Sequence, residues 1–119
     1  MRATGDVFED RALEHLKRAG LELLARNFQN RFGEIDLVMR DGDTLVFVEV
    51  RYRRGRGFGS AADSVTARKR ERLVRAARGY LAAHPEHASR ACRFDLVAFD
   101  GKPAQALIDW QRGAFDAED

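Results

Sequence analysis

Segment 33–51, GEIDLVMRDGDTLVFVEVR, brings two carboxylates and a guanidinium onto neighbouring β-prone runs. Asp36 lies in the first run, Glu49 and Arg51 lie in the second, and the turn-forming residues 41–43 (DGD) separate them. A two-residue turn beginning at the first of these residues would place Asp36 diagonal to Glu49, and a turn one residue later would place them directly opposite. Both registers put the carboxylates on one face within about 8 Å, whereas a three-residue loop would separate them.

Like carboxylates on an apolar hairpin repel each other and lose solvation, so something must offset that cost. A divalent cation would do so, because the hard oxygens of Asp36 and Glu49, with the backbone carbonyl of Val50, suit Mg²⁺ or Mn²⁺. Arg51 shares the face of Glu49 and could hold a phosphate or an attacking water. The alternative is a structural ion-pair ladder of Asp36, Glu49 and Arg51, and spacing alone leaves both open.

Strand alternation also predicts how the hairpin packs. The apolar positions of each run share the face that points away from the carboxylates: Ile35, Leu37 and Met39 in the first run, and Val46, Val48 and Val50 in the second.

The helical periodicity predicts helices over 6–19 and 62–83, each with a charged residue inside its apolar arc. Glu9 lies in the arc of the first helix, where it would either face the same site as Asp36 and Glu49 or pair with an arginine. Lys69 lies in the arc of the second helix, where it would either snorkel to the helix edge or reach the carboxylate face.

Residues 51–78 carry ten Lys or Arg against two acids, although the net charge of the chain is only +2. A local basic field beside a carboxylate site favours a polyanionic partner. The glycine-rich loop 53–60 is interpreted as a flap over backbone phosphates, with a solvated loop as the alternative, and Phe58 either stacks or anchors it. The residues predicted to contact nucleic acid are Arg53, Arg54, Arg56, Arg68 and Arg72.

The 119 residues suit a single domain, predicted over 1–115, followed by a frayed acidic tail at 116–119. The single cysteine excludes an intrachain disulfide framework and favours a reducing cytoplasm. No segment resembles a signal peptide or approaches membrane-spanning length, so no membrane association is expected. Three histidines and one cysteine make a zinc site a poor interpretation.

Further strands are predicted over 22–28, 92–99 and 104–110, so the elements run helix, three strands, helix, two strands. This αβββαββ order, with acids on the central hairpin, resembles the restriction-endonuclease-like core of the PD-(D/E)xK nuclease superfamily. More closely, the chain is identified as a member of the YraN-like bacterial family, itself similar to archaeal Holliday junction resolvases. The resemblance rests on Gly5 with Glu9, Asn27, GEIDLV at 33–38, FVEVRYR at 47–53, Phe58-Gly59, the 65–69 segment and RFDLV at 93–97.

The resemblance implies an α/β fold with a mixed sheet of about five strands flanked by two main helices. It makes Asp36 and Glu49 the metal-binding acids, matches Glu9 to the helix-one acid of the resolvases, and puts Arg51 where the superfamily has a catalytic lysine. Arginine stays protonated at any usable pH and cannot act as a general base, although it can orient a water or stabilise a charged transition state. Lys69 is then the candidate to supply the missing amine.

These features favour an endonuclease that uses Mg²⁺ or Mn²⁺ to hydrolyse the phosphodiester backbone of DNA, with branched DNA as the implied substrate. One alternative is a nucleic-acid-binding module with a silent or very slow site, because arginine replaces the lysine. Another is a structural or protein-interaction domain whose acids form an ion-pair network. The resolvases are often two-fold dimers, so the resemblance also brings in a homodimer as a candidate assembly.

Overall fold

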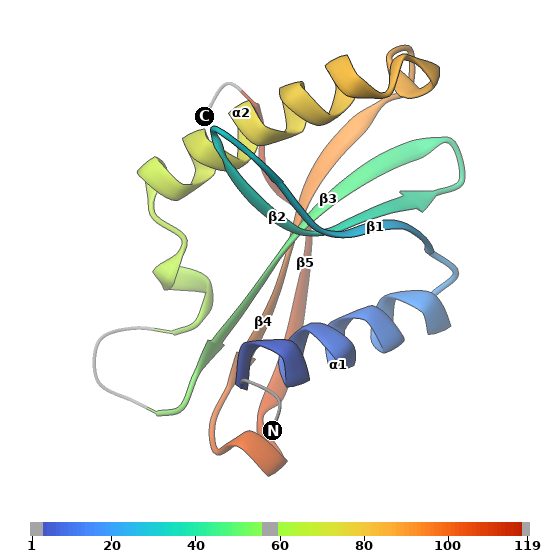
Figure 1. Ribbon diagram of the computed structural model, residues 1–119. Helices are drawn as coiled ribbons and strands as arrows, with labels where there is room; N and C mark the ends of the chain where they lie inside the picture. The colour runs from blue at the N-terminus through green and yellow to red at the C-terminus, as the bar shows by residue number, and fades with distance from the viewer. Residues whose placement is uncertain (1–3, 56–59, 118–119) are drawn as a thin grey trace.

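A computed structural model describes residues 4–55 and 60–117. Its main helices and strands follow one another along the chain in the predicted order αβββαββ (Figure 1). The elements are α1 (Thr4–Arg18), β1 (Glu22–Asn30), β2 (Gly33–Asp41), β3 (Thr44–Arg53), the 3₁₀ turn η1 (Ala62–Ser64), α2 (Ala67–Ala83), η2 (Pro85–His87), β4 (Cys92–Asp100), η3 (Pro103–Gln105) and β5 (Leu107–Phe115).

Within the described residues, the strands form one five-stranded sheet in the order β1-β2-β3-β4-β5. All neighbours are antiparallel except β3 and β4, which pair in parallel from Leu45–Cys92 to Arg53–Asp100. A parallel pair needs a long crossover connection, and α2 provides it. The predicted mixed α/β fold with the order αβββαββ is therefore confirmed and is consistent with a restriction-endonuclease-like core.

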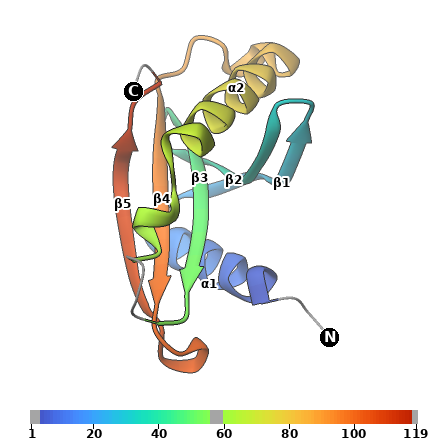
Figure 2. The ribbon, with the colours of Figure 1, turned by 90° about the vertical axis from the view of Figure 1, so that its left-hand side faces the viewer.

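The sheet is a central layer with α1 on one face and α2 on the other (Figure 2). On the α1 face, Phe8, Ala12 and Leu16 pack against apolar side chains from the strands: Leu37, Met39, Val46, Val48, Val97 and Phe99. On the α2 face, Leu73, Ala77 and Tyr80 pack against a second set: Ile35, Val38, Leu45, Phe47 and Phe94. The central parts of β2 and β3 are buried on both faces, so a charged side chain next to them loses solvation.

The predicted helix over 62–83 is wrong in its first turn. Residues 62–64 form η1, and α2 starts at Ala67 because Thr66 has an extended backbone and its side chain accepts a hydrogen bond from the Lys69 amide. This break between η1 and α2 matters for the site, because both elements contribute residues to it.

The predicted last strand over 104–110 is also displaced. Pro103 starts η3, so β5 begins only at Leu107, and it continues to Phe115 past a bulge in its pairing with β4. Gly113 lies at this irregularity with φ 57°, a conformation that glycine adopts without the usual steric cost. The edge position predicted for this strand is observed.

In the part of the chain that the structure describes, none of the helices has the length and apolar character that crossing a lipid bilayer requires.

Candidate functional site

The turn between β2 and β3 sets the register of the acidic residues. Asp41 pairs with Thr44, so Gly42 and Asp43 form a two-residue turn in which Gly42 has φ 60°. The register runs back to the Leu37–Val48 pair, and the next residues along the two strands are Asp36 and Glu49. Of the two registers that the sequence allows, the structure has the one that places these carboxylates opposite each other.

The strands β2 and β3 separate where the carboxylates begin. Their ladder ends at Leu37–Val48, although β3 stays paired with β4 as far as Arg53. Beyond that point, the Val50 amide donates to Asp36 Oδ2 at 2.8 Å. The acid pair, Asp36 and Glu49, therefore lies in the fork between the diverging strands.

One predicted packing face is wrong. Ile35 was expected on the same face as Leu37 and Met39, but it packs on the α2 face whereas they pack on the α1 face. The alternation fails at the point where Asn27 of β1 has φ 55° and the β1–β2 ladder has no pair between Arg26–Leu37 and Phe28–Ile35. On β3 the expected faces hold, with Phe47 facing α2 and Val46, Val48 and Val50 facing α1.

Both carboxyl groups of the acid pair have pKa values above the ordinary values of Asp and Glu. Burial raises the pKa of Asp36, and hydrogen bonds from Glu49 and the Val50 amide only partly oppose it. Burial also raises the pKa of Glu49, and the charge of Asp36 adds to that effect, while Arg51 and Lys69 lower it less. The two carboxyl groups are close enough for each to shift the pKa of the other, as in other close carboxyl pairs. No described Lys or Arg lies within 4 Å of either one, so the alternative of an ion-pair ladder is not what the structure contains.

Arg51 is held beside the acid pair by a serine. Its Nε donates to Ser64 Oγ at 2.9 Å, and that hydroxyl donates to the Ala61 carbonyl at 2.6 Å. Ser64 is only 6% exposed, so its hydroxyl is committed to these partners. Ser64 is not among the residues predicted for the site, because a lone serine ahead of a helix carries no sequence signal that would identify it.

Lys69 reaches the carboxylate face rather than snorkelling away from it. Its Nζ donates to the Ser64 carbonyl at 3.3 Å, and its charge lowers the pKa of Glu49. A pocket of about 210 Å³ opens here, lined by Gly33, Glu34, Glu49, Arg51, Lys69, Arg72 and Leu73. The pocket is open to solvent, and Glu49 shares its lining with the cationic side chains of Arg51, Lys69 and Arg72.

Glu9 both pairs with an arginine and lies near Asp36, so the two predicted alternatives occur together. It lies 3.6 Å from Arg26 Nε, and its pKa is raised by burial and by the nearby charge of Asp36. With its amide nitrogen turned toward the acids, Asn27 donates to Glu9 Oε1 and Glu34 Oε1 at 3.0 Å each. Asn27, the residue that breaks the strand alternation, thus links the α1 acid to the mouth of the pocket.

The donor set fits a hard divalent cation bound through few protein ligands. Among the described residues, no group of three or more His, Cys, Asp or Glu side chains is arranged to hold a metal. Mg²⁺ commonly binds through one or two carboxylates and keeps its remaining positions for water and substrate phosphate, which is what Asp36 and Glu49 could offer. The Val50 carbonyl stays a predicted ligand.

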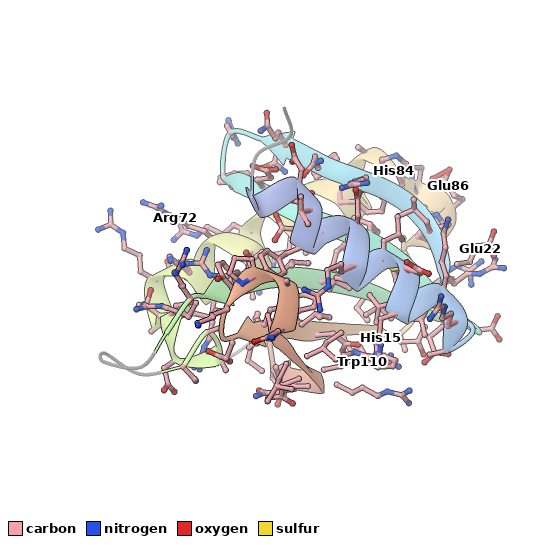
Figure 3. The ribbon with its side chains drawn as sticks, turned by 90° about the horizontal axis from the view of Figure 1, so that it is seen from below. His15, Glu22, Arg72, His84, Glu86 and Trp110 are labelled. Carbon is pink, nitrogen blue, oxygen red and sulfur yellow. The ribbon has the colours of Figure 1, made fainter. Side chains whose placement is uncertain are left out.

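The predicted phosphate-contacting arginines lie on separate elements. Arg53 ends β3 and Arg54 follows it, whereas Arg68 and Arg72 lie one turn apart on α2. Arg72 lines the pocket and lies on the side of the molecule away from Glu22 (Figure 3). Arg56 and Phe58 lie outside the described residues.

The mixed sheet between α1 and α2 defines an α/β domain whose element order is consistent with a restriction-endonuclease-like core. The chain belongs to UPF0102, described as an uncharacterised protein family, whose sequence model matches residues 8–99. This span includes the acid pair, Arg51, Ser64 and Lys69 and ends before β5.

Bacterial relatives match almost the whole chain. It is 50% identical over 113 residues to a UPF0102 protein of Pseudomonas entomophila (strain L48), covering 94% of this chain and 92% of that protein. It is 53% identical over 115 residues to one from Xanthomonas campestris pv. campestris (strain B100), covering 97% and 93%. It is also 52% identical over 120 residues to one from Ralstonia nicotianae, covering 98% and 88%. The predicted YraN-like family is confirmed, while the similarity to resolvases and PD-(D/E)xK nucleases stays a prediction.

Proposed function

We propose that this protein is a metal-dependent nuclease that hydrolyses the phosphodiester backbone of DNA in the cytoplasm. The observation that carries the proposal is the acid pair itself: Asp36 and Glu49 are partly buried, lie close together, and have no described Lys or Arg within 4 Å. Desolvation and mutual repulsion of two close carboxylates lower the free energy of unfolding, and a bound divalent ion would offset that loss.

The residues present suit the chemistry of a phosphodiester. Asp36 and Glu49 would hold Mg²⁺ or Mn²⁺, which when bound supplies Lewis acidity and lowers the pKa of a coordinated water. Arg51 is held by Ser64 with a permanent charge at the site, and such a charge stabilises the negative charge that develops on a phosphate in the transition state. Lys69, in the same pocket, contributes an amine that can exchange a proton.

The basic face of α2 supports a polyanionic substrate. Arg68 and Arg72 are exposed on this helix, and neither has a carboxylate within ion-pair distance among the described residues. Their charges are therefore available to phosphates, and such contacts position a backbone without reading its sequence. DNA is proposed ahead of RNA on the resemblance to resolvases.

A nucleic-acid-binding module with a silent or very slow site is the second candidate. Arg51 favours it, because a guanidinium cannot accept the proton that a catalytic lysine could take. The Lys69 ammonium is also committed to the Ser64 carbonyl at 3.3 Å. This candidate requires DNA affinity that falls steeply with salt and no metal-dependent turnover.

Cleavage of branched and linear DNA by the purified protein, in Mg²⁺ or Mn²⁺ and in EDTA, tests the proposal. We expect metal-dependent cleavage that falls by about 100-fold or more in Asp36→Asn and Glu49→Gln, since each removes a charged ligand at nearly constant volume. Cleavage that persists unchanged in Asp36→Asn would exclude the assignment. An Arg51→Lys protein that cuts while the wild type does not would favour the binding module.

A further inference from the structure

The turn between β1 and β2 presents an aromatic ring covered by a guanidinium. Phe32 is 37% exposed, and Arg31 Cζ lies 4.7 Å from the centroid of its ring. A single exposed phenylalanine is ordinary on a protein surface. Phe32 differs from such a residue because its turn is hydrogen-bonded to α2 and borders the candidate site.

The turn is fixed to α2. The Phe32 amide donates to Asn30 Oδ1 at 2.9 Å, and Asn30 Nδ2 donates to the Ala76 carbonyl of α2 at 3.2 Å. Gly33 packs against the Arg72 side chain, since a Cβ built on it would lie 3.6 Å from Arg72 Cβ. Figures 1 and 2 both show this turn beside α2. The ring therefore belongs to an anchored turn, and little ordering entropy remains to be lost when a ligand stacks on it.

The turn also borders the candidate site. Gly33, the residue after Phe32, lines the pocket together with Glu49, Arg51 and Arg72. Arg31 and Arg72 have no carboxylate within 4 Å among the described residues. An aromatic ring thus lies beside cations that are free to bind phosphate, within one residue of the proposed cleavage pocket.

We propose that Phe32 and Arg31 form a stacking platform for an unpaired base of the nucleic acid strand at the site. Bases that have left the helical stack are bound on aromatic rings and guanidinium planes, and every base has the π-face that such stacking needs. The platform selects for strands with an unstacked base over continuous duplex, whose bases are covered by their neighbours. This inference rests on the proposed function for the identity of the ligand as nucleic acid, and it does not depend on cleavage.

The test measures binding in EDTA, where no cleavage occurs. A duplex with one unpaired 2-aminopurine and a fully paired duplex of the same length are titrated with wild type, Phe32→Ala and Phe32→Trp, using anisotropy and 2-aminopurine fluorescence. Ile108→Ala is the matched control, because Ile108 is also 37% exposed but lies on β5 at the edge of the sheet. Circular dichroism and thermal melting establish that each variant is folded.

We expect Phe32→Ala to weaken binding of the unpaired-base duplex by on the order of tenfold and to abolish the fluorescence change. Phe32→Trp retains both, and the paired duplex and the Ile108→Ala control change by less than about twofold. Equal losses on both duplexes, no loss in Phe32→Ala, or no binding of either DNA would overturn the inference.

Failure of this inference is distinguishable from failure of the nuclease proposal. A protein that cuts DNA in a metal-dependent way, and whose preference for the unpaired base survives Phe32→Ala, refutes the platform alone. A protein that holds the unpaired base through Phe32 and never cuts refutes the nuclease alone.

Discussion

The acid pair and Asp95 are carboxylates of one sheet with opposite surroundings, the acid pair partly exposed and Asp95 buried. Asp95 of β4 is fully buried, and it accepts hydrogen bonds from Arg93 Nε at 3.0 Å, Trp110 Nε1 at 3.0 Å and the Gly113 amide at 2.9 Å. Arg93 also donates a hydrogen bond to Asp41 at 2.8 Å, so the hydrogen bonds around Asp95 and Arg93 connect β2, β4 and β5. Trp110 lies beside His15 of α1 in an edge-to-face contact (Figure 3).

The acid pair has no such donors. Asp36 accepts a hydrogen bond from the Val50 amide, and otherwise the two carboxyl groups face each other with raised pKa values. When this fold buries a carboxylate for structure, it supplies a cation and neutral donors, as at Asp95. The contrast supports the proposal that the acid pair binds a cation, because without one its unpaired charges lower the stability of the folded state.

Replacing Asp95 tests the structural half of this comparison and should have the largest effect. Asp95→Asn removes the charge that Arg93 pairs with and turns an amide toward the donors of Trp110 and Gly113. We expect the free energy of unfolding to fall by about 3–5 kcal/mol, as for other broken buried ion pairs. Urea denaturation measures this, with Asp109→Asn on the exposed part of β5 as the control that should change little. If Asp95→Asn lowered the free energy of unfolding by less than Asp36→Asn does, Asp36 and not Asp95 would be the structural carboxylate.

Replacing Glu49 tests the other half and should have the opposite sign. The folded-state pKa of Glu49 is raised, so ionising this residue opposes folding at every pH above its unfolded value near 4.5. Stability of the metal-free protein should therefore decline as the pH rises from that value toward the folded-state pKa of about 9, and Glu49→Gln should remove the part of this decline that Glu49 contributes. At pH 8 we expect Glu49→Gln to be more stable than wild type by about 1–3 kcal/mol in EDTA.

Added Mn²⁺ or Mg²⁺ should reverse that order. Ligand binding to the folded state stabilises wild type by about 1–3 kcal/mol at concentrations well above Kd, whereas Glu49→Gln should gain little. Thermal melts at pH 8 with and without the cation compare the two. A Glu49→Gln protein that loses stability in EDTA would show that the acid pair is structural after all.

The fold and the acid pair were open to sequence reasoning because local patterns determine them. The residues 41–43 limit the hairpin to few registers, and alternation then brings Asp36 and Glu49 to one place. Helical periodicity likewise predicted that Lys69 faces inward. In each case the information lies within a few residues of the side chain concerned.

What sequence reasoning missed depends on contacts between distant segments. The RFDLV motif includes Asp95, but its donors Trp110 and Gly113 follow fifteen and eighteen residues later and reach it only through the β5 bulge. The change of face at Ile35 coincides with the left-handed conformation of Asn27 in the neighbouring strand, which strand alternation cannot anticipate. The hydrogen bond from Arg51 to Ser64 depends on the break between η1 and α2, where a continuous helix was predicted.

Replacing Ser64 sharpens the comparison, because this serine gives Arg51 of the candidate site a fixed hydrogen-bond partner, as Asp95 has in its own surroundings. Ser64→Ala removes the acceptor of Arg51 Nε with almost no change in volume, so we expect a loss of about 1–2 kcal/mol in stability. Ser60→Ala, the same change on the exposed side of the η1 segment, is the control.

The effect on cleavage separates positioning from stability. A guanidinium that loses its anchor is no longer held where charge develops, so kcat of metal-dependent cleavage should fall about tenfold in Ser64→Ala, with KM for DNA little changed. In an Arg51→Lys background the same substitution should have almost no further effect, because the lysine does not make the Nε hydrogen bond. Full additivity of the two changes would mean that Ser64 supports the fold and does not act through Arg51.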